Sequence, residues 1–183
     1  MSGELAGTVI AVSSDISHRF SKVPKLSVKL IKDHGIEGDA HAGPFMRHRH
    51  LAKRAPKLAN NRQVHLIQSE LFGDLKLLGF EVRPGELGEN ITTRGIDLLE
   101  LPLGSLLHLG NGAIVELTGL RTPCGYLDRF QKGLKRTMIV RTHAGARFRS
   151  GVLGIVRESG ELMYGDVINA EPPSRPWQPL PAL

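Results

Sequence analysis

The sequence predicts a mainly β (α+β) fold, a single strand-rich domain with a few short helices. Its apolar runs are short, rich in Val, Ile and Leu, and bounded by Gly, Asn and Asp, which is typical of many short strands. Glycine is frequent, at 21 of 183 residues. The length, with 40% hydrophobic and 23% charged residues, is that of one globular domain. We expect the domain over residues 1–170 and a Pro-rich tail over 171–183, which holds five of the 11 prolines.

The apolar runs predict eight strands in chain order. These strands are Leu5–Val12, Leu26–Ile31, Gln63–Leu66, Ile91–Thr93, Ser105–Leu109, Ala113–Thr118, Gly151–Arg157 and Asp166–Ala170. Gly and Asn at 109–113 predict a hairpin, because both tolerate the positive φ of a tight turn. A second hairpin is expected at 159–161.

Two helices are expected among these strands. Leu71, Leu75 and Leu78 share one face of a helix from Ser69 to Leu78, with Ser69 as N-cap and Gly79 as its C-terminal stop. A second helical piece is expected over 134–141. The basic segment 42–61 has little periodicity, which favours a long surface loop or a loose helix over a site. The tail should be extended, either packed on the domain or disordered.

Positive charge is concentrated in two stretches. The formal net charge is +6, and residues 40–69 and 129–157 contain no Asp or Glu but carry 14 of the 24 Lys and Arg. If the two stretches converge, they form a cleft that attracts an anion; otherwise they are two solvated basic surfaces. Aromatic residues make up only 5%, and no nucleic-acid-binding signature is present, so nucleic acid is the less favoured partner.

The sequence also bears on the compartment. One cysteine cannot form an internal disulfide, which fits a reducing environment. The first residues have no basic region before an apolar run, and no stretch approaches the roughly 20 apolar residues of a membrane helix. We therefore expect a cytoplasmic protein with no membrane partner.

The segment around the single cysteine is the most informative. A predicted strand ends just before Arg121-Thr122-Pro123-Cys124, where Thr122 reads as an N-cap and Pro123 as the first helical residue. Cys124 would then lie at the second helical position, where the helix dipole and Arg121 favour a thiolate. The alternative is a buried cysteine that acts as a small hydrophobic residue.

Other candidate residues lie in two polar segments. Asp39 and His41 would share one side of the glycine-rich segment 35–43 if it is extended. Asn90 and Thr92 lie at the mouth of a predicted strand, where they could hydrogen-bond the edge of a heterocycle or simply cap a turn.

These segments together resemble the MOSC family, which is named for the C-terminal domain of molybdenum cofactor sulfurases. The resemblance spans residues 3–170, and the matching pieces in order are Gly35–Ala40, Gly88–Gly95, Arg121–Cys124, Gly151–Val156 and Gly160–Asp166. It implies a distorted β-barrel, association with molybdenum cofactor (molybdopterin), and Cys124 as the working residue. A His-Gly-Gly motif found in many relatives is absent, so its contacts cannot be transferred. The lyase-like domain of full sulfurases is also absent, so pyridoxal phosphate would act only through a separate sulfurase partner.

The residues and the resemblance together suggest a binding mode. Arg121, with Arg62 and Arg136 from the basic stretches, would hold the pterin phosphate by charge-assisted hydrogen bonds. The other expected cofactor-binding residues are Thr122, Asn90, Thr92, Asp39 and His41.

Three functions remain open. In the first, Cys124 takes sulfane sulfur as a persulfide from a cysteine desulfurase or similar donor, and delivers it to a molybdoenzyme or cofactor-assembly protein. In the second, Cys124 ligates molybdenum in a reductase of N-hydroxylated compounds. The third is a basic nucleic-acid-binding module.

Overall fold

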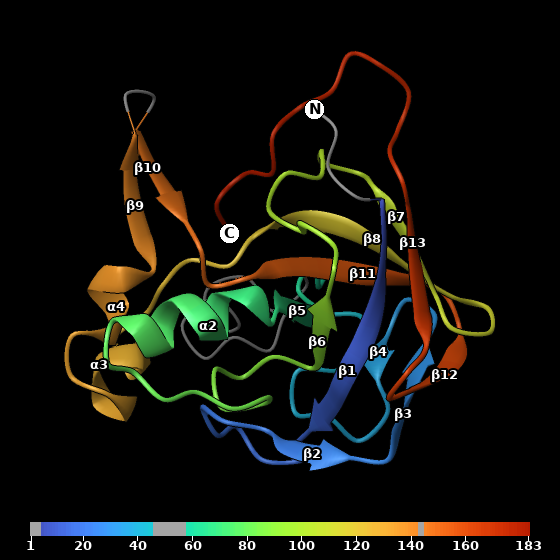
Figure 1. Cartoon of the computed structure of the whole chain (residues 1–183). Helices are drawn as coiled ribbons and strands as arrows, with labels where there is room; N and C mark the ends of the chain where they lie inside the picture. Colours follow the sequence, from blue (N-terminus) through green and yellow to red (C-terminus); the bar gives the residue numbers. More distant parts are fainter. Residues whose placement is uncertain (1–4, 46–57, 143–144) are drawn as a thin grey trace.

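The chain folds around a closed barrel of seven strands, which confirms the predicted fold class. The computed structural model describes residues 5–45, 58–142 and 145–183. The main sheet runs in the order β13-β7-β8-β11-β5-β6-β1-β2, and pairing of β13 with β1 closes it (Figure 1). All neighbouring strands pair antiparallel except β5 and β6, which are parallel. The barrel is therefore distorted rather than a simple up-and-down barrel.

Thirteen strands and three helices make up the described residues. The strands are β1 Ala6–Ser14, β2 Val23–Lys25, β3 Ser27–Ile31, β4 Gly35–Ile36, β5 Val64–Gln68, β6 Ile91–Arg94, β7 Leu106–Leu109, β8 Ala113–Leu120, β9 Ile139–Thr142, β10 Gly145–Phe148, β11 Val152–Glu158, β12 Gly160–Met163 and β13 Val167–Glu171. The helices are α2 Glu70–Leu77, α3 Tyr126–Phe130 and α4 Leu134–Thr137. Each of the eight predicted strands is present, with its ends within two residues of the predicted ones.

The barrel encloses the main apolar core. Strand β8 shows why these runs form strands, because its Val115 and Leu117 point inward and are fully buried, while the residues between them are partly exposed. The β7–β8 pairing, with Leu109 opposite Ala113, confirms the predicted hairpin. A bulge between Val9 and Ala11 shifts the register of the pairing between β1 and β6.

A second, three-stranded sheet packs on the barrel. Its order is β12-β3-β4, and its Val28, Leu30 and Leu162 join the barrel core. The hairpin predicted at 159–161 was wrong, because β12 pairs with β3 while β11 is already paired on both sides by β5 and β8. The chain does turn at Ser159, but the strand after it crosses to the other sheet.

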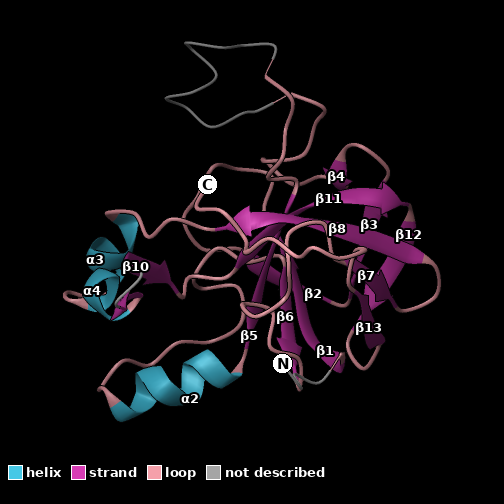
Figure 2. Cartoon of the chain, turned by 90° about the horizontal axis from the view of Figure 1, so that it is seen from above, coloured by secondary structure: helices cyan, strands magenta, loops and turns pink. Residues whose placement is uncertain are grey.

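The helices gather on one side of the barrel around a separate apolar cluster (Figure 2). Helix α2 matches its prediction, with Leu71 and Leu75 buried, although Leu78 is exposed and the Ser69 side chain forms no capping hydrogen bond. The helix predicted over 134–141 was wrong beyond Thr137, since the next residues form strand β9, paired with β10.

The tail packs against the barrel. The Leu120 N–H donates to the Pro181 carbonyl at 2.7 Å, and the Leu183 N–H donates to the Leu120 carbonyl at 2.9 Å. Leu180 is buried, and a Cβ on Gly119 would lie 2.6 Å from both Leu183 Cγ and the Pro181 carbonyl oxygen. Glycine at 119 therefore allows the tail to lie directly on the end of β8.

The predicted surface loop 42–61 lies partly outside the described residues, at 46–57. The described ends of this segment approach each other, because Phe45 and Ala59 form an isolated antiparallel bridge.

Candidate functional site

Cys124 lies in an irregular turn between the end of β8 and helix α3. The predicted helix start was wrong, because α3 begins at Tyr126 with Gly125 as its N-cap. Thr122 does not cap the helix; its N–H and hydroxyl both donate to the Leu183 carbonyl oxygen, and the N–H distance is 3.1 Å. Because α3 has only five residues and begins after Cys124, the cysteine does not lie at the predicted second position of a helix. Cys124 is partly exposed, so it is not the sealed hydrophobic residue of the alternative interpretation.

The side chain of Arg121 supplies the charge nearest to Cys124. Burial lowers the pKa of the Arg121 guanidinium, and the nearby Cys124 and Glu89 act in the opposite direction. Its Nη1 is buried without a hydrogen-bond partner. The guanidinium carbon lies 5.9 Å from the centre of the Phe20 ring, a distance that permits a cation–π contact. Arg121 therefore keeps a free donor beside the cysteine.

Arg62 and Glu89 complete this group of side chains, which we call the Cys124 corner: Cys124, Arg121, Arg62 and Glu89. Arg62 is close enough to Arg121 to lower its pKa, and the Arg62 Nε is also buried without a partner. Burial raises the pKa of Glu89, whose Oε1 accepts hydrogen bonds from the Gly85 N–H and the Thr92 hydroxyl, while Oε2 has no partner. The corner thus has two cationic side chains with unused donors and one buried carboxyl.

A second group, the Asp39 network, consists of Asp39, Lys22, Asn90 and His41. Lys22 Nζ lies 2.5 Å from Asp39 Oδ2, and Asn90 Nδ2 donates to the same oxygen at 3.0 Å. The His41 N–H donates to Asp39 Oδ1 at 2.9 Å. Desolvation opposes ionisation of Asp39, but these donors hold its pKa well below the usual range. The network joins the segment after β4 to the start of β6.

The structure brings most of the predicted site residues together. Asp39 is directly hydrogen-bonded to His41 and Asn90, and Arg62 and Cys124 each lie near Arg121. Thr92 serves Glu89. Arg136 is exposed on α4 and, among the described residues, has no hydrogen bond or ion pair with the corner.

Sequence reasoning missed Lys22, Glu89 and Phe20. Of these three, only Glu89 could have been found from the sequence, because it directly precedes Asn90, one of the expected binding residues. The backbone conformation explains why the same segment has glycine at 88. With φ at +84°, a Cβ on Gly88 would lie 2.5 Å from the Phe20 carbonyl oxygen. Glycine at 88 therefore lets the segment carrying Phe20 pass close to the corner.

Part of the second basic stretch is neutralised by carboxylates. From 129–157, Arg147, Arg149 and Arg157 each form an ion pair, with Glu100, Asp74 and Glu116 respectively. These three arginines therefore supply no unpaired positive charge to a common cleft. Five basic residues of the first stretch fall within 46–57, outside the described residues.

A groove adjoins the corner between residues 15–23 and α3. It has a volume of about 470 Å³ and is lined by Asp15, Arg19, Phe20, Ser21, Lys22, Val23, Tyr126, Arg129 and Phe130. We call it the arginine–aromatic groove. Lys22 connects it to the Asp39 network, and Phe20 connects it to Arg121.

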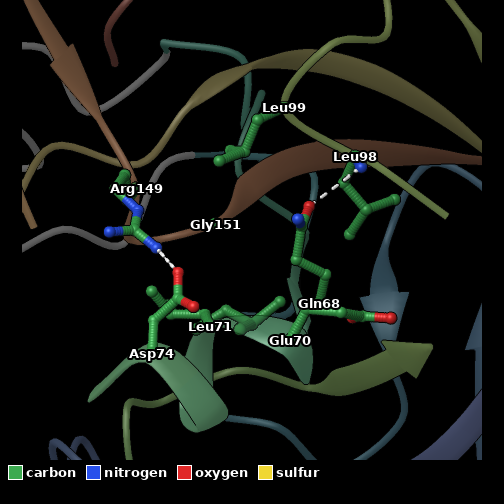
Figure 3. A pocket seen from close by; sticks show the side chains of 9 residues that line it. Gln68, Glu70, Leu71, Asp74, Leu98, Leu99, Arg149 and Gly151 are labelled. Carbon is green, nitrogen blue, oxygen red and sulfur yellow. Dashed lines mark hydrogen bonds and ion pairs between the residues drawn. The ribbon is translucent and has the colours of Figure 1, made fainter. Parts of the chain in front are cut away.

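A second hollow lies between α2 and the barrel but is too small for an organic ligand. Figure 3 shows it spanned by the ion pair of Arg149 with Asp74 and by the hydrogen bond from the Leu98 N–H to Gln68 Oε1, 3.0 Å long. Its volume of about 50 Å³ is close to that of one or two waters.

The fold and the site define a closed-barrel protein with a partly exposed cysteine, two half-buried arginines that carry unpaired N–H groups, and a buried polar network. The MOSC domain family model matches residues 39–169, and the chain belongs to this family. This confirms the resemblance inferred from the sequence. No curated protein matches the chain.

Solved structures show the same fold. The YuaD protein from Bacillus subtilis is 23% identical, with 92% of this chain and 97% of that one covered and a TM-score of 0.75. YiiM from Escherichia coli is 16% identical, with 93% and 73% covered and a TM-score of 0.61. YiiM from Geobacillus stearothermophilus is 17% identical, with 91% and 74% covered and a TM-score of 0.58. No described helix is long and apolar enough to span a bilayer.

The residues of the site fit an anionic cofactor. MOSC domains are associated with molybdenum cofactor, and the unused donors on Arg121 Nη1 and Arg62 Nε suit the phosphate that this cofactor carries. A buried donor without a partner is costly in a folded protein, and a bound anion would remove that cost.

Proposed function

We propose that this protein binds molybdenum cofactor and handles sulfur, with Cys124 carrying sulfane sulfur as a persulfide for delivery to a molybdenum centre. The observation that carries the proposal is the position of Cys124, partly exposed and close to Arg121, whose buried Nη1 has no partner. Arg121 and Arg62 would hold the phosphate. The molybdenum, when bound, supplies the acceptor for the sulfur.

Cys124 would receive its sulfur by thiol exchange. The Cys124 thiolate attacks the terminal sulfur of a donor persulfide; a new S–S bond forms at Cys124, the donor's S–S bond breaks, and the donor leaves as a thiolate. No net oxidation or reduction occurs. Arg121 would supply a positive charge close to the sulfur throughout the exchange. A cysteine desulfurase that uses pyridoxal phosphate is the class of donor this step needs.

Intact-mass measurement tests the carrier function. After incubation with a cysteine desulfurase and L-cysteine, the protein should gain the mass of one sulfur atom, and a reducing agent should remove it. Because Cys124 is the only cysteine, Cys124→Ala is a clean control that should gain nothing. An unlabelled wild-type protein that nevertheless copurifies with molybdopterin would contradict the carrier role while leaving cofactor binding intact.

A reductase is the second candidate, and the arginine–aromatic groove favours it. A sulfur carrier needs no site for an organic substrate besides the cofactor. A groove of about 470 Å³, lined in part by Tyr126 two residues after Cys124, is large enough for such a substrate. In this function Cys124 would ligate the molybdenum, and a separate electron-donor protein would supply two electrons by way of the metal. With two protons from solvent, these electrons would reduce an N-hydroxylated compound, whose N–O bond breaks and whose oxygen leaves as water. Turnover of such a compound by cofactor-loaded protein, abolished in Cys124→Ala, is the expected result.

A further inference from the structure

We propose that the arginine–aromatic groove binds a planar aromatic anion, a flat ring system that carries a carboxylate or phosphate. The residues that line the groove are sufficient to support this binding site. Its assignment as the substrate site rests on the reductase function proposed above.

The walls of the groove suit a flat ring. The Phe20 and Tyr126 rings are nearly parallel, with an interplanar angle of 16° and centroids 6.1 Å apart, and Phe130 lies 5.9 Å from Phe20. Tyr126 is half exposed and Phe20 is partly exposed, so part of each ring is open to solvent. The exposed parts of two rings that line a hollow can contact a planar ligand.

The charges of the groove select an anion. Among the described residues, neither Arg19 nor Arg129 forms an ion pair within 4 Å, and the guanidinium carbon of Arg129 lies 5.0 Å from the centre of the Tyr126 ring. A stacked guanidinium keeps its N–H groups in its own plane, free to donate to a carboxylate or phosphate.

One acidic side chain determines where the anion would lie. Asp15 also lines the groove, and its Oδ1 already accepts hydrogen bonds from the Ser17 N–H at 2.7 Å and the Ser17 hydroxyl at 2.6 Å. These hydrogen bonds lower the pKa of Asp15 and keep it ionised, so it repels an anion at its own end. The acidic group of the ligand would therefore lie near Arg129, with the ring against Phe20 and Tyr126.

The groove is placed to present this ligand to the Cys124 corner. Phe20 has the Arg121 guanidinium near its ring, and Tyr126 follows Cys124 by only two residues. A ring stacked on Phe20 would thus lie next to the side chains that surround the cysteine. The site is distinct from the unused donors of Arg121 and Arg62, which belong to the corner.

Titration calorimetry with 2-naphthoate tests the proposal, with 2-naphthamide as a neutral probe of the same shape. We expect 2-naphthoate to bind about tenfold more tightly, because a hydrogen bond to a charged group contributes more than a neutral one. Arg129→Gln should remove that preference, and Tyr126→Leu should weaken both probes. Tyr126→Phe should keep the affinity, which separates stacking from a folding defect. Arg94→Gln, an exposed arginine at the end of β6, should change nothing.

Two results overturn the proposal: equal affinity for the two probes, or an unchanged affinity in Arg129→Gln. Cys124→Ala separates it from the proposed functions, since this variant should lose sulfur loading or turnover but still bind 2-naphthoate. The pterin ring is itself a planar aromatic group joined to a phosphate. If cofactor-loaded protein no longer binds 2-naphthoate, the groove holds the cofactor and its assignment as a substrate site is overturned.

Discussion

The ammonium of Lys22 and the carboxylate of Asp39 form a buried ion pair, with side chains only 4% and 1% exposed. Asn90 donates to the same carboxylate oxygen, so three segments far apart in the chain meet at one atom. Desolvation lowers the pKa of Lys22 and opposes its charge, and the attraction of Asp39 compensates in part. The pair holds β2, the segment after β4 and the start of β6 in one arrangement beside the Cys124 corner.

Removing one member of this pair should destabilise the protein strongly. Asp39→Ala would leave the Lys22 charge buried without a partner, which we expect to cost about 3–5 kcal/mol of the free energy of unfolding. Urea denaturation measures this loss. The exposed pair of Lys32 with Glu158 is the matched control, and Glu158→Ala should cost less than about 1 kcal/mol. Equal effects of the two substitutions would contradict the role of the buried pair.

Acid should destabilise the protein in two stages. Burial holds the pKa of His65 well below its ordinary value, so below about pH 6.5 the unfolded chain binds a proton that the folded state does not. The free energy of unfolding should therefore fall by up to about 1.4 kcal/mol per pH unit below that point. The stability from Asp39, whose pKa is lowered, is fully present above about pH 4 and is lost as the pH falls further.

Urea denaturation between pH 7.5 and pH 5 isolates the first stage. His65→Gln should flatten the pH dependence over this range, although it also loses the hydrogen bond from the ring to the Ser150 carbonyl, 2.8 Å long, and is less stable throughout. His108→Gln, on the exposed side of β7, should keep the wild-type slope. A slope that persists in His65→Gln would show that another group is responsible.

Arg121→Met should strongly reduce the amount of pterin phosphate that the purified protein retains. The substitution removes the buried guanidinium with its unused donor and leaves an apolar side chain of similar length beside Phe20. We expect at least a tenfold loss of bound pterin, the effect of one charge-assisted hydrogen bond, measured by the fluorescence of the oxidised pterin after purification from a cofactor-producing host. Arg94→Met serves as the control and should retain wild-type pterin content.

Gly119→Ala should release the tail from the end of β8. The new methyl group would collide with the Pro181 carbonyl and the Leu183 side chain, so the hydrogen bonds from Thr122 to Leu183 should open. Hydrogen exchange of the Thr122 and Leu183 amides should become faster, while exchange in β5 stays slow. Gly73→Ala in α2 has open space around it and should leave these amides unchanged. Protection of Thr122 equal to wild type would show that the tail is not held through Gly119.

The strands were predictable because each depends on a local pattern. In β8 an alternation of buried and partly exposed residues spans seven positions, and the turn residues at 110–112 fix where the preceding strand ends. Cys124 and Asn90 were also predictable, since their neighbours in the sequence mark them. Their roles in binding and sulfur transfer stay predictions.

The rest depends on contacts between distant segments. Lys22 meets Asp39 and Asn90 only after the barrel closes, and nothing next to it in the sequence signals a buried lysine. Likewise, the stretch 129–157 contains no Asp or Glu, but its Arg149 pairs with Asp74 of α2, 75 residues away in the chain. The sequence predicts Thr122 as a helix cap because Pro follows it, but its hydroxyl donates to Leu183, 61 residues away in the chain.

The docking of Leu183 on Thr122 matters for how the protein is handled. An affinity tag fused after Leu183 would leave the surface two residues from Cys124 and compete for the Thr122 hydrogen bonds. A purification tag is therefore better placed at the N-terminal end, whose first described residue, Leu5, accepts a hydrogen bond from the Ala170 N–H. If a protein with a C-terminal tag fails to load sulfur, the measurement has to be repeated without the tag before the failure is attributed to Cys124.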